Sequence, residues 1–464
     1  MKTFSKIPGV LILMLFIMLS ACEKNQTEIK DQPLKNVKTP YVKGEVIVAY
    51  KNKDAKDKYG KLVANHLNEN FENVELVKCS DCLELTELWR ADGIEDHIGS
   101  ILNSVIDGSN DIVRTTPTVV AGTTGDGDLA ISLNYITEVF DSDGAKLKKP
   151  DYSNTPKSND NLVVAILDSG IDTEFIGDTY LWQSAASSSC FPSEIFGWNF
   201  TENGESFDVS DNTSSMHGTI VNLYILEQLV VHAESVPRLL NVKVLNEKNQ
   251  GSLFSLVCGV HYAVNKGASI INTSLGFYDY EVYDNFPQKK HPVMHYLHTS
   301  YANDGSVLFV TAAGNGKGKF DDGRNLEKNP FYPAVLSDNF LSKINNVLTV
   351  TTSDGLGNEV SDRQNYSPRH VDAAIRSDFD GDFSFQFPFQ ENLSNQDRLV
   401  GSSFSNAILT GKIAYGWKPE FRNLFRDDAK ANWVRAILQA DNRSEQLANK
   451  VNEGVSYSRL NNRQ

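Results

Sequence analysis

Four short motifs, far apart in the chain but in a fixed order, constrain this sequence more than any other feature. They cover residues 166–172, 216–219, 311–316 and 401–407, and each contains one side chain that we single out for its chemistry. These side chains are a carboxylate at a strand end, an imidazole, an amide in a glycine turn and a hydroxyl at a helix start: Asp168, His217, Asn315 and Ser403. Acid, base, amide and hydroxyl are the groups that acyl transfer requires.

The four residues have distinct expected roles. A serine hydroxyl attacks a carbonyl only when an imidazole takes its proton, and a carboxylate must hold that imidazole in one tautomer. We therefore expect Asp168 to orient His217, and His217 to act as the base for Ser403. The oxyanion of the tetrahedral intermediate needs donors already in place, which an amide and a helix N-terminal N–H supply. Asn315 and the Ser403 N–H are the candidates.

Each motif taken alone has a simpler explanation. Asp168 follows the apolar run 162–167 and precedes Ser-Gly, which is typical of an ordinary strand-to-turn exit. A single histidine such as His217 is usually a packed or surface residue, and Ser402 or Ser403 is a suitable helix cap. The shared order favours the catalytic interpretation, because independent features would otherwise have to coincide.

The order Asp, His, Asn, Ser resembles that of the subtilisin-like serine proteases, the subtilases, from about Val163 to the C-terminal region. This resemblance implies an α/β, three-layer fold with a mostly parallel central sheet. Between the motifs, apolar patterning favours alternating strands and helices, with the site at the carboxyl ends of the strands. The expected elements are strand 239–245, helix 252–266, strand 268–276 and strand 305–310.

The resemblance also implies that an extended peptide substrate binds by strand addition, with side-chain pockets setting preference. Ala313 and Gly314 would line part of the first pocket and favour an apolar side chain there, although plain core packing explains them nearly as well. The contact groups are Ser274, Leu275 and Gly276; Gly251, Ser252 and Leu253; and Ala313 with Gly314.

The chain departs from the family pattern near the site. Asn222 and Leu223 stand where alanine and glycine are typical, and Ala407 replaces a proline early in the helix after the serine. Losing that proline removes a preset φ angle but no catalytic group. We expect altered helix packing and an unchanged reaction type.

The N-terminus predicts export. Lys2 and Lys6 precede the apolar run 10–19, which is too short to span a bilayer but suits a secretory signal. The run ends in Leu-Ser-Ala-Cys22, which resembles a bacterial lipobox. This implies removal of residues 1–21, lipid on Cys22 and attachment to a bacterial membrane in the cell envelope. A soluble secreted protein is the alternative. Residues 22–40 have the composition of a polar tether.

A small α+β unit is expected over residues 41–118. It resembles the ferredoxin-like propeptide of subtilases, which implies folding assistance and inhibition of the active site; an unrelated accessory domain is the alternative. A linker with the processing region would follow at 119–160, and the peptidase domain at 161–464. The unit's predicted elements are strands 44–50, 74–77, 83–89 and 111–117 and helices 56–70 and 94–106.

The net charge of the chain bears on which partners it can bind. The chain has 464 residues, 40% of them hydrophobic, and a formal net charge of −15. That charge argues against nucleic acid or an anionic membrane surface as a binding partner.

Five cysteines are present, and Cys22 is assigned to lipid. We expect Cys258 to pack as a small buried residue, and Cys79 with Cys82 to form a local disulfide or remain thiols, because no second pair completes a zinc site. Neither a histidine cluster nor an aspartate cluster has a recognised metal-binding pattern: His291, His295 and His298; Asp378, Asp380 and Asp382. We therefore predict no metal and no cofactor, with structural calcium left open and no ligands assigned.

Together these features predict a lipid-anchored, subtilisin-like endopeptidase made as a zymogen. Its partners would be protein or peptide substrates and its own propeptide as an intramolecular inhibitor. The alternative is a subtilase-fold surface lipoprotein that binds peptides without cutting them. An α/β-hydrolase esterase is disfavoured, because no Gly-x-Ser-x-Gly motif surrounds Ser403.

Overall fold

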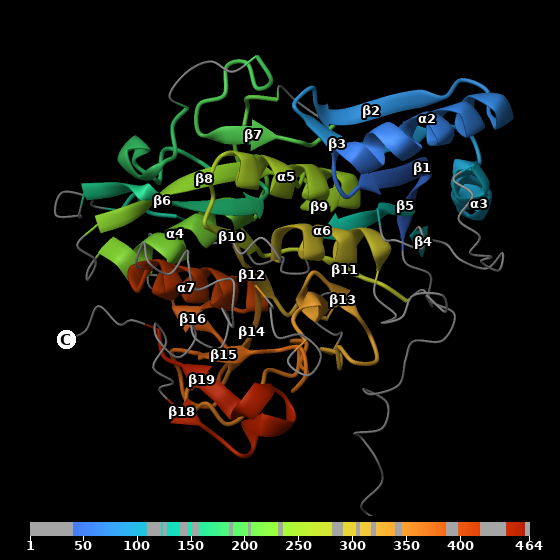
Figure 1. Cartoon of the computed structure of the whole chain (residues 1–464). Coiled ribbons are helices and arrows are strands. Elements are labelled where there is room, and N and C mark those ends of the chain that lie inside the picture. The colour runs from blue at the N-terminus through green and yellow to red at the C-terminus, as the bar shows by residue number, and fades with distance from the viewer. Residues whose placement is uncertain are drawn as a thin grey trace, which may run out of the picture.

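The structure is a computed structural model of the whole chain (Figure 1). The predicted signal sequence, Cys22, most of the tether and the predicted strand 111–117 lie outside the residues that it describes. The described residues are 40–108, 122–123, 128–139, 147–150, 157–184, 189–202, 206–230, 235–280, 291–302, 307–316, 322–338, 346–386, 398–417 and 442–459.

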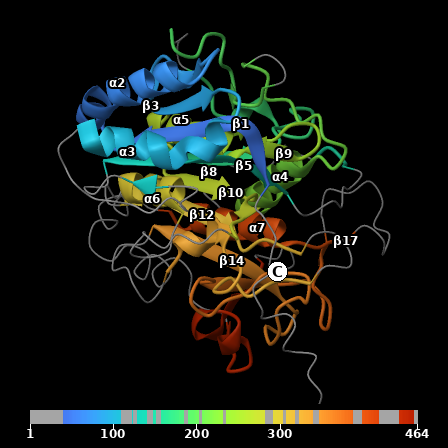
Figure 2. The same cartoon turned by 90° about the vertical axis from the view of Figure 1, so that its right-hand side faces the viewer.

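The described residues between 40 and 139 form an N-terminal module built on an antiparallel sheet of strand order β2-β3-β1-β5-β4. Its helices α2 and α3 lie on the side of this sheet away from the rest of the molecule (Figures 1 and 2). The elements are β1 (Tyr41–Tyr50), α2 (Lys53–Asn70), β2 (Glu75–Ser80), β3 (Leu83–Arg90), the 3₁₀ helix η1 (Ile94–His97), α3 (Ile98–Gly108), β4 (Gly122–Thr123) and β5 (Leu129–Glu138).

Local sequence explains helix α2. The Asn52 side chain accepts the Ala55 N–H at 2.8 Å and so satisfies one of the helix's unpaired donors. Ala55, Tyr59, Val63 and Leu67 recur at every fourth position and are all buried. The predicted helices and the first three predicted strands of the module are therefore confirmed within a few residues.

Strand β5 differs from the sequence prediction, which placed these residues in the linker. It lies beside β1, with Ile131 opposite Val48. Most of its residues are buried on both faces, because one face meets the module and the other meets the main domain. Its residues alternate between apolar and polar from Ile131 to Tyr135, which is a strand pattern, but the surrounding Gly, Thr, Asp and Ser residues favoured a linker.

The main domain, residues 157–459, contains a sheet with the order β18-β19-β15-β14-β12-β10-β6-β8-β7 among the described residues. All neighbours in it are parallel except β18 and β19, which confirms the mostly parallel α/β fold. Its strands are β6 (Lys157–Asp168), β7 (Gly197–Asn199), β8 (Ser235–Lys243), β10 (Ile270–Thr273), β12 (Leu308–Ala312), β14 (Val347–Ser353), β15 (Ala373–Arg376), β18 (Asn442–Arg443) and β19 (Val455–Tyr457).

Helices cover both faces of this sheet and complete three layers. Along β6, Val164 and Ile166 pack into the core under one pair of helices, whereas Ala165 and Leu167 pack into the core under the other pair. The first pair is α4 (His217–Val230) and α7 (Ser402–Tyr415), and the second is α5 (Leu253–Asn265) and α6 (Pro292–Ala302).

The remaining elements are short and lie in connections of the main domain. They are β9 (Gln250–Ser252), β11 (Phe277–Tyr278), β13 (Phe331–Tyr332), β16 (Phe385–Gln386), β17 (Arg398–Leu399), η2 (Asp178–Tyr180), η3 (Ala334–Leu336), η5 (Leu447–Asn449) and η6 (Asn452–Gly454).

Cys258 is buried as predicted, but the expected local disulfide or free thiols at Cys79 and Cys82 were wrong. Cys79 is bonded to Cys258, and Cys82 is bonded to Cys190, so each disulfide joins the N-terminal module to the main domain. The partners are 179 and 108 residues apart in sequence. Spacing along the chain identifies local pairs, but it carries no information about a partner that only the tertiary fold brings near.

Candidate active site

The Asp168 carboxylate lies against the His217 imidazole. Its Oδ1 is 2.8 Å from Nδ1 of His217, and both side chains are buried. Asp168 is the last residue of β6 and His217 is the first of α4. The Ser169 N–H also donates to Asp168 Oδ1, at 2.7 Å. A carboxylate held by its own turn is well placed to fix the orientation of the ring.

Helix α4 begins close to the turn after β6. A Cβ on Gly218 would lie 2.3 Å from the Gly170 carbonyl oxygen, so a larger residue would push the helix away. Met216, directly before the helix, has φ of 52° in the left-handed region that non-glycine residues rarely adopt. The chain accepts this backbone strain where it positions His217.

The half-buried carboxylate of Asp211 links the turn that follows Asp168 to the first turn of α4, which carries His217. Its Oδ1 accepts the hydroxyl hydrogens of Ser169 at 3.0 Å and Thr213 at 2.7 Å. Its Oδ2 accepts the Thr219 N–H at 3.0 Å and the Thr219 hydroxyl at 2.9 Å. The Ser169 hydroxyl in turn accepts the Gly218 N–H at 2.9 Å. These bonds satisfy the first donors of α4 in place of a capping side chain.

Lys243 adds a buried positive charge to this network. It lies opposite Asp168 in the β6–β8 pairing, and its Nζ donates to the Ser169 carbonyl oxygen. Burial lowers the pKa of Lys243, while the nearby carboxylates of Asp211, Asp208 and Asp168 act in the opposite direction. Neither Asp211 nor Lys243 was predicted from the sequence, because neither belongs to a motif and their partners are distant in sequence.

Ser403 is the second residue of α7. Its hydroxyl donates to the Ser274 carbonyl oxygen at 3.2 Å, and the Ser274 hydroxyl donates to the Ser403 carbonyl oxygen at 3.2 Å. The ring of Phe404 lies 5.9 Å from the His217 ring, centre to centre. The starts of α4 and α7 are therefore adjacent, and the structure brings Asp168, His217 and Ser403 to one edge of the sheet.

Asn315 faces the start of the same helix. Its Oδ1 accepts the Ser402 N–H at 3.1 Å, and the Ser402 hydroxyl accepts the Gly314 N–H at 3.1 Å. Gly314 has φ of +86°, which favours glycine in this turn. The bond to Ser402 fixes which end of the Asn315 amide can donate to a reacting carbonyl.

The two predicted substrate edges are paired with β5 of the N-terminal module. On one side, Thr137 lies opposite Gly251 and Ile136 opposite Ser252. On the other side, the Glu138 N–H donates to the Gly276 carbonyl oxygen at 2.9 Å, and the Gly276 N–H donates to the Glu138 carbonyl oxygen at 3.2 Å. Strand β5 thus lies between both edges, as an extended peptide would.

The other predicted contact residues are placed differently. Leu253 starts helix α5 and its side chain is fully buried, so it packs in the core. Leu275 and Ala313 are buried as well. The Ala313 carbonyl oxygen accepts the Asn365 amide at 2.8 Å, which holds the turn before Asn315 in place.

The expected change in helix packing at Asn222 has a structural basis. The buried Asn222 amide donates to the Gly218 carbonyl oxygen at 2.8 Å and to the Asn241 side-chain oxygen at 2.9 Å. It therefore joins α4 to β8 by a polar contact. Ala407 is fully buried within α7.

Two of the three clustered aspartates, Asp378 and Asp382, make ion pairs. Asp378 accepts from Arg459 at 2.6 Å, and Asp382 accepts from Arg398 at 2.5 Å. Within the described residues no group of three His, Cys, Asp or Glu side chains could hold a metal ion. Among those same residues, no helix is long and apolar enough to cross a bilayer.

The sequence profile of the subtilase family matches residues 159–456, which is more than half of the chain and includes all four motifs. The chain belongs to the subtilase family. No curated protein gives a significant match to the sequence.

Several solved structures resemble this subtilase at low sequence identity. The subtilase cytotoxin SubAB is 18% identical, with a TM-score of 0.44, over 66% of this chain and 89% of that one. A lanthipeptide protease is 20% identical, with a TM-score of 0.42, over 60% and 79%. Fervidolysin from Fervidobacterium pennivorans, a keratinolytic enzyme related to subtilisin, is 15% identical, with a TM-score of 0.44, over 85% and 58%.

Proposed function

We propose that this subtilase is a serine endopeptidase that hydrolyses peptide bonds in protein or peptide substrates. The observation that supports this most strongly is the buried 2.8 Å contact between Asp168 and His217, beside the start of the helix that carries Ser403. A buried carboxylate on the far nitrogen of an imidazole is the arrangement that makes the other nitrogen a base.

In this mechanism the Ser403 hydroxyl attacks the scissile carbonyl while His217 accepts its proton. Asp168 holds the imidazole in the required tautomer and stabilises the imidazolium that forms. The oxyanion binds the Asn315 amide and the Ser403 N–H at the positive end of α7. His217 then returns the proton to the leaving amine, and water hydrolyses the acyl-enzyme by the same steps in reverse.

We also propose that the chain is made as a zymogen, with β5 held in the cleft as an inhibitor. Glu138 lies opposite Gly276 in an antiparallel pairing. If the same pairing continued, the residue two positions after Glu138 would lie opposite Ser274. The Ser274 carbonyl oxygen accepts the Ser403 hydroxyl. Counting two residues from Glu138 gives Phe140, so we expect cleavage between Phe140 and Asp141, both outside the described residues. Intact mass of the processed protein tests this, since any other new N-terminus contradicts the register.

Anchoring remains a proposal that rests on the sequence. The mature chain would begin at Cys22 and carry lipid there, which would hold the enzyme at a bacterial membrane in the cell envelope. Mass spectrometry of the N-terminal peptide should find the acyl groups on Cys22. An unmodified peptide that begins elsewhere would exclude the anchor.

The catalytic proposal is tested by hydrolysis of an unfolded protein such as casein, with and without dithiothreitol. We expect Ser403→Ala to abolish cleavage and Ser405→Ala, on the same helix, to retain it. Cleavage that persists in Ser403→Ala would contradict the proposed nucleophile. Casein binding without hydrolysis by the folded wild-type chain in both conditions would instead support the peptide-binding alternative.

A further inference from the structure

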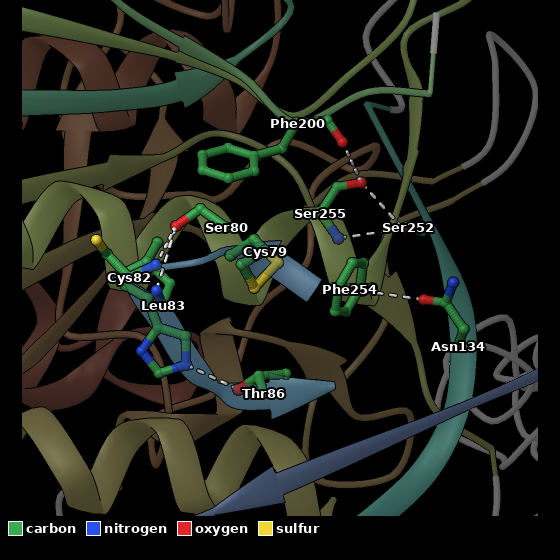
Figure 3. Close-up of a disulfide and its surroundings, with 12 residues drawn as sticks. Cys79, Ser80, Cys82, Leu83, Thr86, Asn134, Phe200, Ser252, Phe254 and Ser255 are labelled. Carbon is green, nitrogen blue, oxygen red and sulfur yellow. Dashed lines mark hydrogen bonds between the residues drawn. A yellow bond between two sulfur atoms is a disulfide. The ribbon is translucent and has the colours of Figure 1, made fainter. Parts of the chain in front are cut away.

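The hairpin that joins β2 and β3 is fastened covalently to the main domain. Cys79 at the end of β2 is bonded to Cys258 in α5, and Cys82 in the turn is bonded to Cys190 in the loop before β7, with Cα–Cα distances of 5.3 and 5.7 Å. Figure 3 shows Cys79 and Cys82 at this junction, with Thr86 further along the hairpin. Both ends of the hairpin turn are therefore tied to the main domain.

The interface beside the disulfides is packed and polar contacts cross it. The Thr86 hydroxyl lies 2.9 Å from Nε2 of His261, and the Phe254 N–H donates to the Asn134 side-chain oxygen at 2.9 Å (Figure 3). The Tyr296 hydroxyl donates to the Tyr50 carbonyl oxygen. Apolar residues of the module and of α5 and α6 belong to one continuous core. The module therefore packs against the main domain through a defined interface.

We propose that the N-terminal module stays attached as a disulfide-linked inhibitor after the chain between β5 and β6 is cut, and that a dithiol reductant releases it. This inference rests on the proposed function, because it assigns the regulation of the same cleft. Strand β5 occupies both substrate edges, through Thr137 at Gly251 and Glu138 at Gly276, so a peptide cannot pair with these edges until β5 leaves.

Cleavage alone does not remove such an inhibitor. After one peptide bond is cut, an ordinary inhibitory segment dissociates to an extent that depends on dilution. A segment tied by disulfides keeps a high effective concentration at its site whatever the protein concentration. Retention of β5 in the cleft is then set by the two S–S bonds.

The reduction follows ordinary thiol–disulfide exchange. Cys82 is exposed and Cys258 is fully buried, so we expect the Cys82–Cys190 bond to be attacked first. A reductant thiolate attacks one sulfur and forms a mixed disulfide, and the second thiol of the reductant resolves it. Each protein disulfide takes up two electrons and two protons and yields two thiols, while the dithiol becomes a disulfide. Both bonds must be reduced before the module is free.

The covalent part of the inference is tested on Ser403→Ala, so that the result does not depend on the chain's own activity. A recognition sequence for a site-specific protease is inserted between Asp151 and Pro156, and the purified protein is cut there. We expect one band on denaturing gels without reductant and two bands with it. The Cys82→Ser variant should still give one band, and Cys79→Ser with Cys82→Ser should give two. Two bands from the unsubstituted cysteine protein without reductant would overturn the inference.

The regulatory part is tested on the active, processed chain with a fluorogenic peptide. We expect low activity per mole of enzyme that is independent of protein concentration and rises at least tenfold with dithiothreitol. The Cys79→Ser/Cys82→Ser variant should need no reductant and should gain activity on dilution, whereas Cys82→Ser should behave like the wild type. Equal activity of all three without reductant would overturn release by reduction while leaving the peptidase function intact. Absence of activity in every variant and condition, together with failure of a fluorophosphonate probe to label Ser403, would instead contradict the proposed function.

Discussion

Oδ1 of Asp168 lies 2.8 Å from Nδ1 of His217, and this contact joins the carboxyl end of β6 to the first residue of α4. It is one of several hydrogen bonds that hold the start of α4 against the turn after β6, together with the one from the Gly218 N–H to the Ser169 hydroxyl. The geometry leads to predictions for the pair, for the oxyanion site and for the residues that support them.

Replacing Asp168 by asparagine should lower turnover by about 10⁴-fold, as in other enzymes with this triad, because an amide stabilises the wrong imidazole tautomer. The change is close to isosteric, so the protein should remain folded by circular dichroism. Peptide hydrolysis by the reduced enzyme measures the effect. Turnover within a few-fold of wild type would exclude Asp168 from the mechanism.

Replacing Asn315 by alanine should lower the turnover number by roughly 10²- to 10³-fold, because one oxyanion donor is lost. The Michaelis constant should change little, since the amide acts mainly on the transition state. Steady-state kinetics on a small peptide separates the two constants. A large rise in the Michaelis constant at normal turnover would assign Asn315 to substrate binding instead.

Asp211 is a positioning residue, and its test needs a neighbour as control. Asp211→Asn removes the charge that accepts from Ser169, Thr213 and Thr219, and should destabilise the start of α4 by about 1–2 kcal/mol. The turnover number should fall by a larger factor than the Michaelis constant changes. Asp208→Asn, in the same loop near Lys243, should have a smaller effect on both stability and turnover. Identical kinetics for Asp211→Asn and wild type would contradict a positioning role.

His261 makes the module interface sensitive to acid. Burial lowers its pKa to about 4 from an ordinary value near 6.5. Between these values the unfolded chain binds the proton and the folded chain does not, so stability falls as pH drops from 6.5 towards 4, by up to roughly 3 kcal/mol. His261→Gln should therefore lose less thermal stability between pH 7 and pH 4.5 than wild type. Parallel losses in the two proteins would show that His261 does not cause the acid sensitivity.

Much of the fold was predictable because short stretches of the sequence have the residue patterns of particular strands, turns and helix starts. The run 162–167 is apolar without interruption, as expected for a strand buried on both faces, and it ends at Asp168. The glycine turn before Asn315 and the serine pair that opens α7 likewise have local signals. These motifs predicted the residues that the structure gathers at one sheet edge.

Other features depend on tertiary contacts and leave no local signal. Cys258 looks like any small apolar residue of α5, and only the folded hairpin brings Cys79 to it. Asp211 lies in a polar loop and acquires its role from Ser169, far away in sequence. Strand β5 has an alternating pattern but lies in a stretch rich in glycine, threonine, aspartate and serine, and only the fold shows that it pairs with β1. Distance in sequence, rather than weak patterning, limits what can be inferred.

The most direct test of the central claim is to map the adduct of a fluorophosphonate probe on the reduced enzyme by peptide mass spectrometry. Ser402, Ser403 and Ser405 lie side by side in α7, so the fragment spectra must assign the label to one of them. We predict a single adduct on Ser403, strongly reduced in His217→Ala and absent in Ser403→Ala. An adduct on another serine, or one that persists in Ser403→Ala, would contradict the account.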